Sequence, residues 1–410
     1  NDILPTQMPG WAQVESALKS VMKQFSFQEI RFPIVEKTEL FKRSIGDLTD
    51  IVQKEMYTFE DGHNGDLLTL RPEGTAACVR ACQQHGLLYN QTQRLWYLGP
   101  MFRHERPQKG RYRQFHQFGV ETFGYDNVAI EIELLSMNYK IWQALGIDKS
   151  VELHINTIGT SQERHTYQQA LTHFLTQHKA ALDDESLMRL EKNPLRILDT
   201  KNLDIQKLLK QAPKLHDYLS TESLSRFSEL CDGLDKLGIT YHHKPNLVRG
   251  LDYYSHSVFE WVTDLLGAQG TLSAGGRYDA LVEQLGGKPT TAAGFAMGIE
   301  RIVLLLETLN GIKEAPKCDI YVVINKPIVM NEVLSFVDKF RQASPHLSIM
   351  TDLSLSRMKS QLKRASASGA QTCLIFEEET FAKQAVSVKS FSDKKEIFTL
   401  SLNELINYYK

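Results

Sequence analysis

The residues from 101 to 115, MFRHERPQKGRYRQF, combine arginines, a glycine and an aromatic ring in a spacing that suits nucleotide chemistry. The pattern predicts the end of one strand, a polar loop and a return strand. Side chains alternate along a strand, so the odd positions of the return strand share one face. That face would present Arg111, Arg113, Phe115, Gln117 and Glu121. Guanidinium groups suit phosphate oxygens and an aromatic ring can stack on a purine, so this is a nucleotide site or, alternatively, an exposed ion-paired hairpin.

A second unusual combination opens the segment LVRGLDYYSHSVFEW at residues 247–261. Its apolar, aromatic and β-branched residues predict a buried strand. Arg249 and Asp252 nevertheless stand at its beginning, on either side of Gly250, and two tyrosines follow them. Charged groups are costly to bury, so their presence at the start of a core strand requires an explanation.

The stretch LTLRPEGT at 68–75 predicts a strand that runs into the start of a helix. Glu73 and Thr75 lie at this junction. A carboxylate beside a hydroxyl could bind an ammonium group, but both residue types also cap helix beginnings. Taken alone, the stretch favours the cap.

A glycine-rich strand leads into an apolar helix in AAGFAMGIERIVLLL, at residues 292–306. Gly294 and Gly298 would allow close backbone approach, and Arg301 would lie just inside the helix. The alternative is an ordinary helix packed on a sheet, with Arg301 paired to Glu300 or another acid.

Length and composition limit how these residues can be positioned. A chain of 410 residues exceeds what one core usually organises, so two or three domains are expected. The net charge of −2 provides no general basic field, so a nucleic acid would have to bind through local patches. The sequence shows no membrane span and no signal peptide. Five cysteines without a CxxC pair favour a reducing cytoplasm over a disulfide framework or a zinc site.

The order of the predicted elements divides the chain into three parts. Residues 1–159 and 244–312 form one domain of strands, glycine-rich segments and helices. Residues 160–243 are polar and mostly helical in pattern, and they interrupt that domain. Residues 317–410 alternate strands and helices, which predicts a compact α/β domain with a mostly parallel sheet.

Each motif is weak alone, but their order and combination resemble the class II aminoacyl-tRNA synthetases, and within them the bacterial-type histidyl-tRNA synthetase family. The segments 31–46 (RFPIVEKTELFKRSIG), 101–115 and 294–306 resemble the three class II motifs. RGLDYY at 249–254 and SAGGRYDALVEQLGG at 273–287 resemble the two signatures of the histidine enzymes. The resemblance covers essentially the whole chain. It implies an α+β catalytic domain built on an antiparallel sheet, a helical insertion and a C-terminal α/β anticodon-binding domain.

The resemblance further implies that the protein is a histidine–tRNA ligase, cytoplasmic and homodimeric. L-Histidine and ATP would give histidyl-adenylate and pyrophosphate, and the histidyl group would pass to the 3′ end of tRNA(His). ATP is then a substrate, with Mg²⁺ bound mainly through its phosphates and no dedicated metal site in the protein. The implied ATP-binding residues are Arg103, Glu105, Arg111, Phe115 and Arg301.

The resemblance also assigns a histidine pocket. Its implied residues are Glu73, Thr75, Arg103, Gln117, Glu121, Arg249, Tyr253 and Tyr254. Arg249 and Arg103 would be catalytic, because a fixed guanidinium beside the reacting carboxylate and phosphate is preorganised for the transition state. The charged residues at the start of the segment 247–261 would then mark where the core opens into this pocket. The role of Asp252 stays open.

For tRNA, the resemblance points to two regions. Gln108, in the loop of the second motif, is a candidate for reading the first base pair. A basic helix of the C-terminal domain is a candidate for phosphate contacts, with a solvated helix face as the equal alternative. Its basic residues are Arg357, Lys359, Lys363 and Arg364.

A different class of function has the same kind of catalytic domain: a regulatory histidine-binding paralogue associated with ATP phosphoribosyltransferase. Such a subunit typically lacks the anticodon-binding domain and has degraded histidine signatures. The present sequence keeps both, together with Arg103, Arg249 and Arg301. This favours the synthetase.

Overall fold

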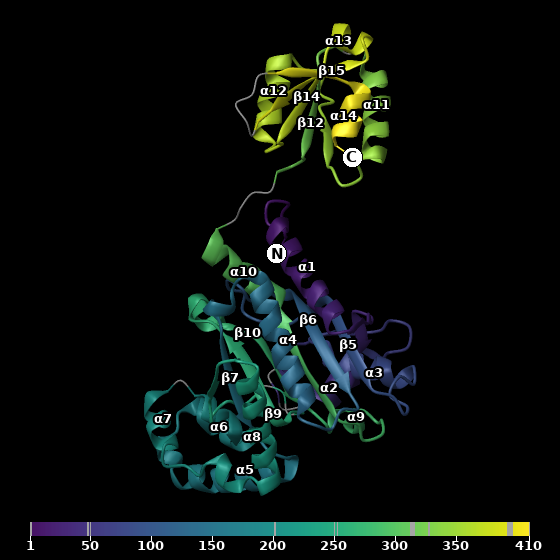
Figure 1. Cartoon of the computed structure of the whole chain (residues 1–410). Coiled ribbons are helices and arrows are strands. Elements are labelled where there is room, and N and C mark those ends of the chain that lie inside the picture. The colour runs from purple at the N-terminus through teal and green to yellow at the C-terminus, as the bar shows by residue number, and fades with distance from the viewer. Residues whose placement is uncertain are drawn as a thin grey trace. The chain divides into compact units, whose positions relative to one another are not determined.

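The structure of the chain is a computed structural model that describes residues 2–46, 49, 51–200, 202–249, 251, 253–311, 316–326, 329–391 and 397–409, without the side chains of 192, 199, 268 and 310. It divides into two compact units, Asn1–Ile312 and Lys313–Lys410. Figure 1 shows the elements of both units, which are taken separately below.

The first unit is built on an eight-stranded sheet with the order β1-β5-β6-β11-β10-β9-β7-β8. The strands are β1 (Gln28–Glu29), β5 (Gln93–Phe102), β6 (Gln114–Phe123), β7 (Glu152–Thr157), β8 (Tyr241–His243), β9 (Ser255–Val262), β10 (Thr271–Arg277) and β11 (Ala292–Gly298). Among the described strands of this sheet, only the outermost pairs, β1 with β5 and β7 with β8, are parallel. The predicted antiparallel sheet is therefore confirmed.

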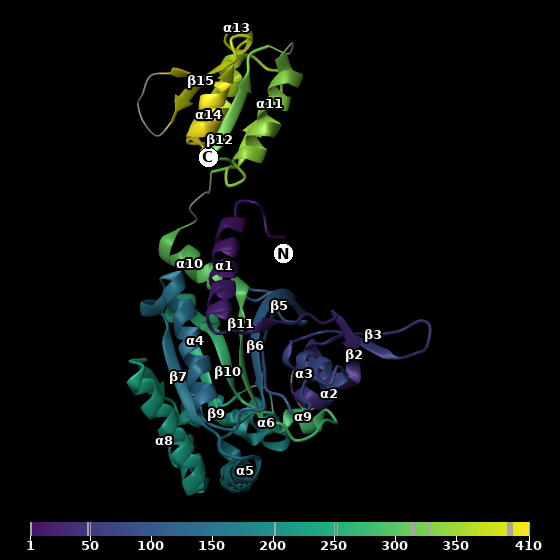
Figure 2. The same cartoon turned by 45° about the vertical axis from the view of Figure 1, so that its right-hand side comes forward.

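Helices cover one face of this sheet and bury its main core. They are α1 (Met8–Gln24), α4 (Ala129–Leu145), α8 (Thr221–Lys236) and α10 (Ile299–Asn310). Figure 2 shows α4 and α8 on one side of the sheet, with α2 and α3 on the other. Even-numbered β6 residues such as Phe118 and Val120 belong to this core and are fully buried. The odd-numbered residues of β6 must then face the opposite side, as the alternation predicted.

The opposite side carries a small three-stranded sheet with the order β2-β4-β3 and three helices. These elements are β2 (Val35–Lys37), β3 (Tyr57–Glu60), β4 (Leu67–Leu70), α2 (Thr38–Ile45), α3 (Thr75–Gln84) and α9 (Leu281–Gln284). Arg71 ties this layer to the large sheet, because its guanidinium donates to the carbonyl oxygens of Phe32 (2.7 Å) and Pro100 (2.9 Å). The start of α3 is thereby held beside β5.

The segment 247–261 differs from the prediction at its beginning. Strand β9 begins only at Ser255, so Arg249 and the two tyrosines lie in the irregular segment that precedes it. Arg249 is tolerated there because the ladder has not yet started and its guanidinium is paired with Glu260. Gly250 and Asp252 lie outside the described residues.

The helical segment between β7 and β8 has a small core of its own. It contains α5 (Ser161–Gln177), α6 (Asp184–Lys192), α7 (Leu203–Leu209) and α8. Tyr167, Leu171 and Leu175 of α5 pack with Leu190 and Ile197. Helix α8 packs instead on the main core, and β8 joins the large sheet. The division of the chain at 160 and 243 stays a prediction.

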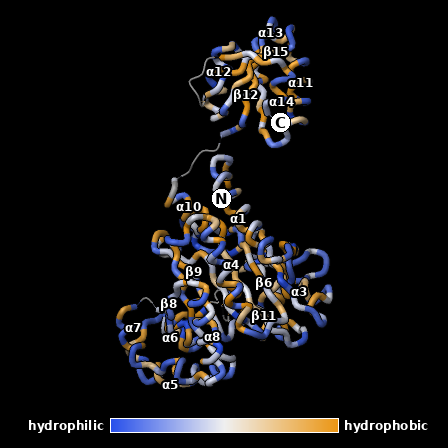
Figure 3. The backbone as a smooth tube through the Cα atoms, in the orientation of Figure 1, coloured by the Kyte–Doolittle hydropathy of each residue, from blue (hydrophilic) through white to orange (hydrophobic). Residues whose placement is uncertain are grey.

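The second unit is a five-stranded sheet with the order β13-β12-β14-β15-β16, covered by helices. Its elements are β12 (Ile320–Ile324), α11 (Met330–Ala343), β13 (Ile349–Thr351), α12 (Met358–Ala367), β14 (Thr372–Phe376), α13 (Glu378–Ala382), β15 (Ala385–Ser390), β16 (Phe398–Ser401) and α14 (Leu402–Tyr408). Figure 3 shows the apolar residues of β12 running through its interior.

The α/β character predicted for this unit is confirmed, but its sheet is mixed and not mostly parallel. β12 pairs in parallel with β13 and β14, whereas β14–β15 and β15–β16 are antiparallel. The sequence shows the reason, because the connection from β14 to β15 covers only residues 377–384, which is too short for the crossover that a parallel pair requires, and no helix connects β15 to β16 in the described part.

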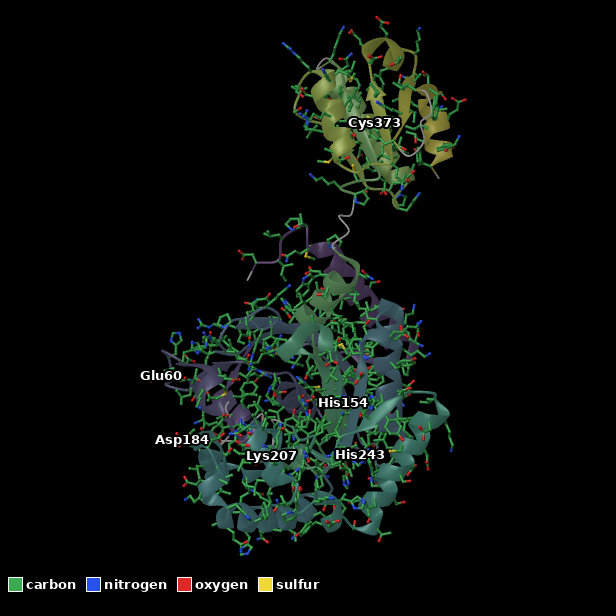
Figure 4. All side chains as sticks on the ribbon, turned by 90° about the vertical axis from the view of Figure 1, so that its left-hand side faces the viewer. Glu60, His154, Asp184, Lys207, His243 and Cys373 are labelled. Atoms are coloured by element: carbon green, nitrogen blue, oxygen red, sulfur yellow. The ribbon has the colours of Figure 1, made fainter. Side chains whose placement is uncertain are left out.

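All five cysteines are free, and Cys78 and Cys82 are fully buried, as expected of small core residues. In Figure 4, Cys373 marks the buried interior of the second unit, while His154 and His243 mark β7 and β8 in the first. Among the described residues, no helix has the length and apolar character that crossing a membrane requires.

Candidate active site

A cavity of about 250 Å³ lies on the side of the large sheet that carries α3. Strands β6, β10 and β11 contribute to it, together with the start of α3, the segment before β9 and the start of α10. All the residues predicted to bind histidine or ATP line this cavity. They are Glu73, Thr75, Arg103, Glu105, Arg111, Phe115, Gln117, Glu121, Arg249, Tyr253, Tyr254 and Arg301.

Glu121 places a deeply buried carboxylate in this cavity, with only 1% of the residue exposed. Its Oε1 accepts hydrogen bonds from the hydroxyls of Thr75 (2.7 Å) and Tyr97 (3.1 Å), and the hydroxyl of Tyr278 donates to Oε2. Burial raises the pKa of Glu121 to about 8, because the ionised form loses its hydration. The three hydroxyls fix the carboxyl group in place, and in its ionised form it can accept an N–H group from a ligand ring.

The ring of Tyr97 fits into space that two glycines leave open. Tyr97 on β5 lies directly opposite Gly119 on β6. A Cβ atom at Gly119 would lie 2.1 Å from the Tyr97 ring, and one at Gly74 would lie 2.2 Å from it. The two missing side chains let the hydroxyl of Tyr97 reach Glu121 and also Gln117, whose Oε1 lies 3.4 Å away.

Glu73 is both a helix cap and part of the cavity lining. Its carboxylate accepts from the backbone N–H groups of Thr75 (2.6 Å) and Ala76 (2.9 Å) at the start of α3. The N–H of Gly74 donates to Oε1 of Gln117 at 3.0 Å. Burial raises the pKa of Glu73 from its ordinary value. The predicted cap is therefore present only in part: Glu73 satisfies two N–H groups, whereas Thr75 is the first residue of α3 and its hydroxyl donates to Glu121. The carboxylate of Glu73 also faces the cavity, where it could receive an ammonium group.

Two arginines bring positive charge to the cavity. Arg103 donates through Nε to the carbonyl of Pro72 at 2.9 Å, and its guanidinium lies 5.3 Å from the ring centre of Phe115. Arg249 is ion-paired with Glu260 on β9 and lies 5.7 Å from the ring centre of Tyr254. Burial lowers the pKa of Arg249, but the interactions with Glu260, Tyr254 and Tyr253 together outweigh burial, so the net shift is upward.

The remaining nucleotide candidates lie on the motif loop and on α10. Arg111 is ion-paired with Glu105, and 39% of its side chain is exposed. Arg301 donates to the carbonyls of Thr271 (2.7 Å) and Gly110 (3.3 Å) and to the side chain of Gln269 (3.0 Å). It is not paired with Glu300, whose carboxylate instead accepts from the N–H of His116 at 2.9 Å.

The sequence analysis also singled out Arg113, Gln108, Gly294 and Gly298, and of these only the two glycines line the cavity. Arg113 is exposed and absent from its lining, because β6 begins only at Gln114 and the alternation does not extend back into the loop. Gln108 is exposed in the same loop. Gly294 does permit a close approach, since a Cβ atom there would lie 2.3 Å from Oε2 of Glu121. Gly298 does not, because only the side chain of Arg301 comes within 4.0 Å of its added Cβ.

In the second unit the four basic residues of α12 and its beginning are all exposed. Three of them, Arg357, Lys359 and Lys363, point to solvent-accessible surface. The fourth, Arg364, is occupied by Asp352, with a distance of 2.9 Å, and by the hydroxyls of Ser354 and Ser356. The guanidinium of Arg364 is therefore already engaged in contacts within its own unit.

The described residues contain no group of three or more His, Cys, Asp or Glu side chains placed to hold a metal ion. Carboxylate oxygens of Glu105 and Glu300 line the cavity, but each already has a partner, Arg111 and His116 respectively.

Three residues that contact the predicted site residues were not themselves predicted from the sequence. Tyr278 lies in the stretch SAGGRYDALVEQLGG, shortly after two glycines, and this glycine pair was the feature that could have indicated it. Tyr97 and Glu260 carry no local signal, because each acts through a partner on a neighbouring strand or segment. Only the assembled sheet places Tyr97 against Glu121 and Glu260 against Arg249.

Comparison with known proteins matches the chain to two family models and to solved structures. The family model described as histidyl-tRNA synthetase matches residues 1–302, and the model described as anticodon binding domain matches residues 319–410. The apo histidyl-tRNA synthetase of S. aureus is 33% identical, with a TM-score of 0.82, and the match covers 100% of this chain and 97% of that chain.

Two more distant structures share the fold. Histidyl-tRNA synthetase from Nostoc sp. PCC 7120 is 19% identical with a TM-score of 0.71, covering 100% of this chain and 97% of that one. A protein from Bacillus halodurans, described as an ATP phosphoribosyltransferase regulatory subunit/histidyl-tRNA synthetase, is 21% identical with a TM-score of 0.63, covering 89% and 94%. At these identities the likeness concerns the fold alone.

Proposed function

We propose that this chain, which belongs to the histidyl-tRNA synthetase family, is a histidine–tRNA ligase that uses ATP to charge tRNA(His). One observation carries the proposal. The same cavity holds a buried carboxylate, Glu121, that suits an imidazole N–H, and two guanidiniums, Arg103 and Arg249, that suit a carboxylate and a phosphate.

In the first step a carboxylate oxygen of histidine attacks the α-phosphorus of ATP. The new P–O bond forms as the bond to pyrophosphate breaks, and both reactants carry negative charge. Arg103 and Arg249 would hold the two anions together and stabilise the charge that develops on the phosphate oxygens. Their positions are already fixed by Pro72 and Glu260, so little rearrangement is needed at the moment of reaction.

Histidine would be oriented by side chains that already have hydrogen-bond partners within the protein and that also face the ligand. Glu73, Thr75 and Gln117 would receive the α-ammonium group. Glu121 would accept from the imidazole, between Tyr253 and Tyr254. A site that commits buried polar groups to one ligand rejects analogues that leave those groups unpaired.

ATP would place adenine on the ring of Phe115, with Arg301 on the other face. Arg111 would turn from Glu105 toward the distal phosphates, and Glu105 would contact the nucleotide. Mg²⁺, held mainly by ATP phosphate oxygens, would neutralise phosphate charge.

The family match over residues 319–410 supports tRNA as the second partner. The exposed residues Arg357, Lys359 and Lys363 would contact tRNA phosphates, with Arg364 available only if it leaves Asp352. Gln108 would face the acceptor end from its exposed loop.

A homodimer is part of this proposal. The segment 31–46, which resembles the dimer-forming motif, leaves Ile34 and Val35 at 41% and 40% exposure. The register places Val35 on β2 and Phe59 on β3, which is 44% exposed, on the same face of the small sheet. An exposed apolar face favours a protein partner. Sedimentation of wild type and Ile34→Asp tests this: a dimer that dissociates in the variant is expected, and a monomeric wild type would contradict it.

The decisive test of function is pyrophosphate exchange with each of the twenty amino acids, followed by charging of tRNA(His) transcripts. Exchange with histidine alone and histidine-dependent charging are expected. Histidine binding without exchange would contradict the proposal and would favour the regulatory histidine-binding paralogue of ATP phosphoribosyltransferase.

A further inference from the structure

The segment that carries Arg249 and the two tyrosines separates two cavities. One is the candidate active site. The other, of about 210 Å³, lies toward α5 and is lined mainly by apolar residues, including Ile158, Tyr167 and Val248. Arg249 and Leu251 line both cavities. The rings of Tyr253 and Tyr254 are buried in a hydrophobic cluster, whereas polar contacts hold the described backbone on either side of them.

Those contacts come from two places. At the beginning of the segment, the side-chain amide of Asn156 on β7 donates to the carbonyls of Pro245 (3.1 Å) and Leu247 (3.0 Å). At its end, the guanidinium of Arg164 donates to the backbone carbonyl of Tyr254. Arg164 lies in the first turn of α5, so a helix outside the active site holds the backbone of a residue that lines it.

The first turn of α5 is itself firmly anchored. The side chain of Glu163 accepts from the N–H of Thr160 (2.7 Å), and the hydroxyl of Thr160 accepts from the N–H of Glu163 (3.2 Å), which closes a capping box. Glu163 also accepts from the N–H of Ser220 (2.6 Å) and the hydroxyl of Ser223 (2.8 Å), at the start of α8. Arg164 therefore projects from a point where two helices are joined.

Movement of the Tyr254 backbone would be transmitted to the histidine-facing side chains. The ring of Tyr254 lies 4.7 Å from that of Tyr253 and 6.1 Å from that of Tyr278, and the hydroxyl of Tyr278 donates to Glu121. The guanidinium of Arg249 lies over the same Tyr254 ring at 5.7 Å. Tyr254 is thus in contact with both the binding side and the catalytic side of the cavity.

We propose that Arg164 is a positioning residue for histidine binding, which couples the start of α5 to the aromatic wall of the pocket. The inference rests on the proposed function only for the identity of the ligand. Because coupling between two sites is reciprocal, the position of α5 sets the affinity for histidine, and histidine in turn stabilises the start of α5.

The test measures histidine binding to the full chain by calorimetry, with wild type, Arg164→Ala, Arg164→Lys and the control Arg226→Ala. Arg226, on α8, likewise donates to a backbone carbonyl of the same unit, that of Asp126, at 2.8 Å. Loss of a hydrogen bond from a charged donor should weaken histidine binding about tenfold in Arg164→Ala. Arg164→Lys should lose less, and Arg226→Ala should bind as wild type does.

Two further readouts separate positioning from general damage. In pyrophosphate exchange, the KM for histidine should rise in Arg164→Ala while the KM for ATP stays within about twofold, because the contact acts on the histidine side. In hydrogen exchange, histidine should protect residues 158–166 in wild type and not in Arg164→Ala. If Arg164→Ala does not fold, Arg164→Lys is measured in the same three ways.

Unchanged histidine affinity in the Arg164 variants, or an equal rise of both KM values, would overturn the inference while leaving the proposed ligase activity intact. The opposite pattern is also distinguishable. A wild-type chain that binds histidine but charges no tRNA would refute the ligase, and the calorimetric comparison would still decide the role of Arg164.

Discussion

The guanidinium of Arg249 is paired with the carboxylate of Glu260 on β9, and among the residues that the structure describes the buried Nε of Arg249 has no hydrogen-bond partner. A buried donor without a partner is costly, and costs of this kind recur where a ligand supplies the missing acceptor. Glu260 therefore orients one side of the guanidinium, and Nε stays available for an oxygen of the reactants.

Replacing Arg249 by alanine should reduce adenylate formation by roughly 10²–10³-fold or more, as does loss of a preorganised donor to a transition-state charge. Histidine-dependent pyrophosphate exchange measures it. Arg94→Ala is the matched control, because Arg94 forms a partly buried ion pair with Glu133 away from the cavity, at 2.8 Å. Near-normal exchange in Arg249→Ala would remove this residue from the mechanism.

Histidine binding should release a proton that comes from Glu121. With a pKa of about 8, the free carboxyl is mostly protonated at pH 7, whereas accepting from an imidazole beside an ammonium group favours the ionised form. At pH 7 we expect wild type to release about one proton more than Glu121→Gln, with the difference fading as the pH rises above 8. Calorimetry in buffers of different ionisation enthalpy measures this.

The same Glu121→Gln variant should bind histidine about 10–100-fold more weakly, because a hydrogen bond to a charged group is lost. Glu133→Gln, on the partly exposed pair with Arg94, controls for loss of a carboxylate elsewhere in the unit. Equal proton release in wild type and Glu121→Gln would show that Glu121 is not the group that ionises.

Alanine at Gly294 should damage the histidine side of the cavity more than the ATP side. Its Cβ atom would lie 2.3 Å from both Glu121 Oε2 and the carbonyl of Val120, and the backbone carbonyl cannot move aside cheaply. We expect about 1–3 kcal/mol of lost stability and a larger rise in the KM for histidine than in that for ATP. In Gly10→Ala the nearest atom, on Val303, lies at 3.5 Å, so that control should be well tolerated.

Glu163 should give the helical segment a stability that depends on pH. Burial acts against ionisation, but hydrogen bonds from Ser220, Thr160 and Ser223 prevail and lower the pKa of Glu163 to about 2. A depressed pKa contributes stability that is complete above the unfolded value near 4.5 and is lost as the pH falls toward 2. Glu163→Gln should therefore cost about 1 kcal/mol at pH 7, as loss of a helix cap does, and less at pH 3.

Urea unfolding at pH 7, 4.5 and 3 measures that difference, with Glu229→Gln on the exposed side of α8 as the control. A destabilisation by Glu163→Gln that is the same at all three pH values would contradict the assigned pKa. It would mean that the side chain acts through its shape and not through its charge.

Residue patterns correctly predicted those parts of the site that depend only on the geometry of a single strand. The alternation along β6 correctly grouped Phe115, Gln117 and Glu121, because a strand fixes which side chains share a face. The same rule failed for Arg113, since the strand begins only at Gln114 and a loop has no alternation. Strand boundaries depend on pairing with distant segments, and β9 likewise starts eight residues later than its apolar pattern suggested.

Contacts between distant segments were not predictable from residue patterns. Tyr97 is a plain strand residue until β6 places Gly119 opposite it, and Arg164 is one arginine of a polar helix until the segment before β9 packs beneath it. The roles of Arg249 and Glu73 came from family resemblance. The pairing of Arg249 with Glu260 is visible only in the folded chain, whereas the contact of Glu73 with the start of α3 was already predicted from the residue types at that junction.

The ring of Tyr97 is enclosed by Gly74 and Gly119, so the residues that these three positions can accept depend on one another. A side chain at either glycine requires a smaller residue at 97, and a smaller residue there withdraws the hydroxyl from Glu121. A single substitution at any of the three positions would therefore lose either the close packing around the ring or the hydrogen bond from the Tyr97 hydroxyl to Glu121. Drift toward another amino-acid substrate would therefore have to begin elsewhere in the pocket.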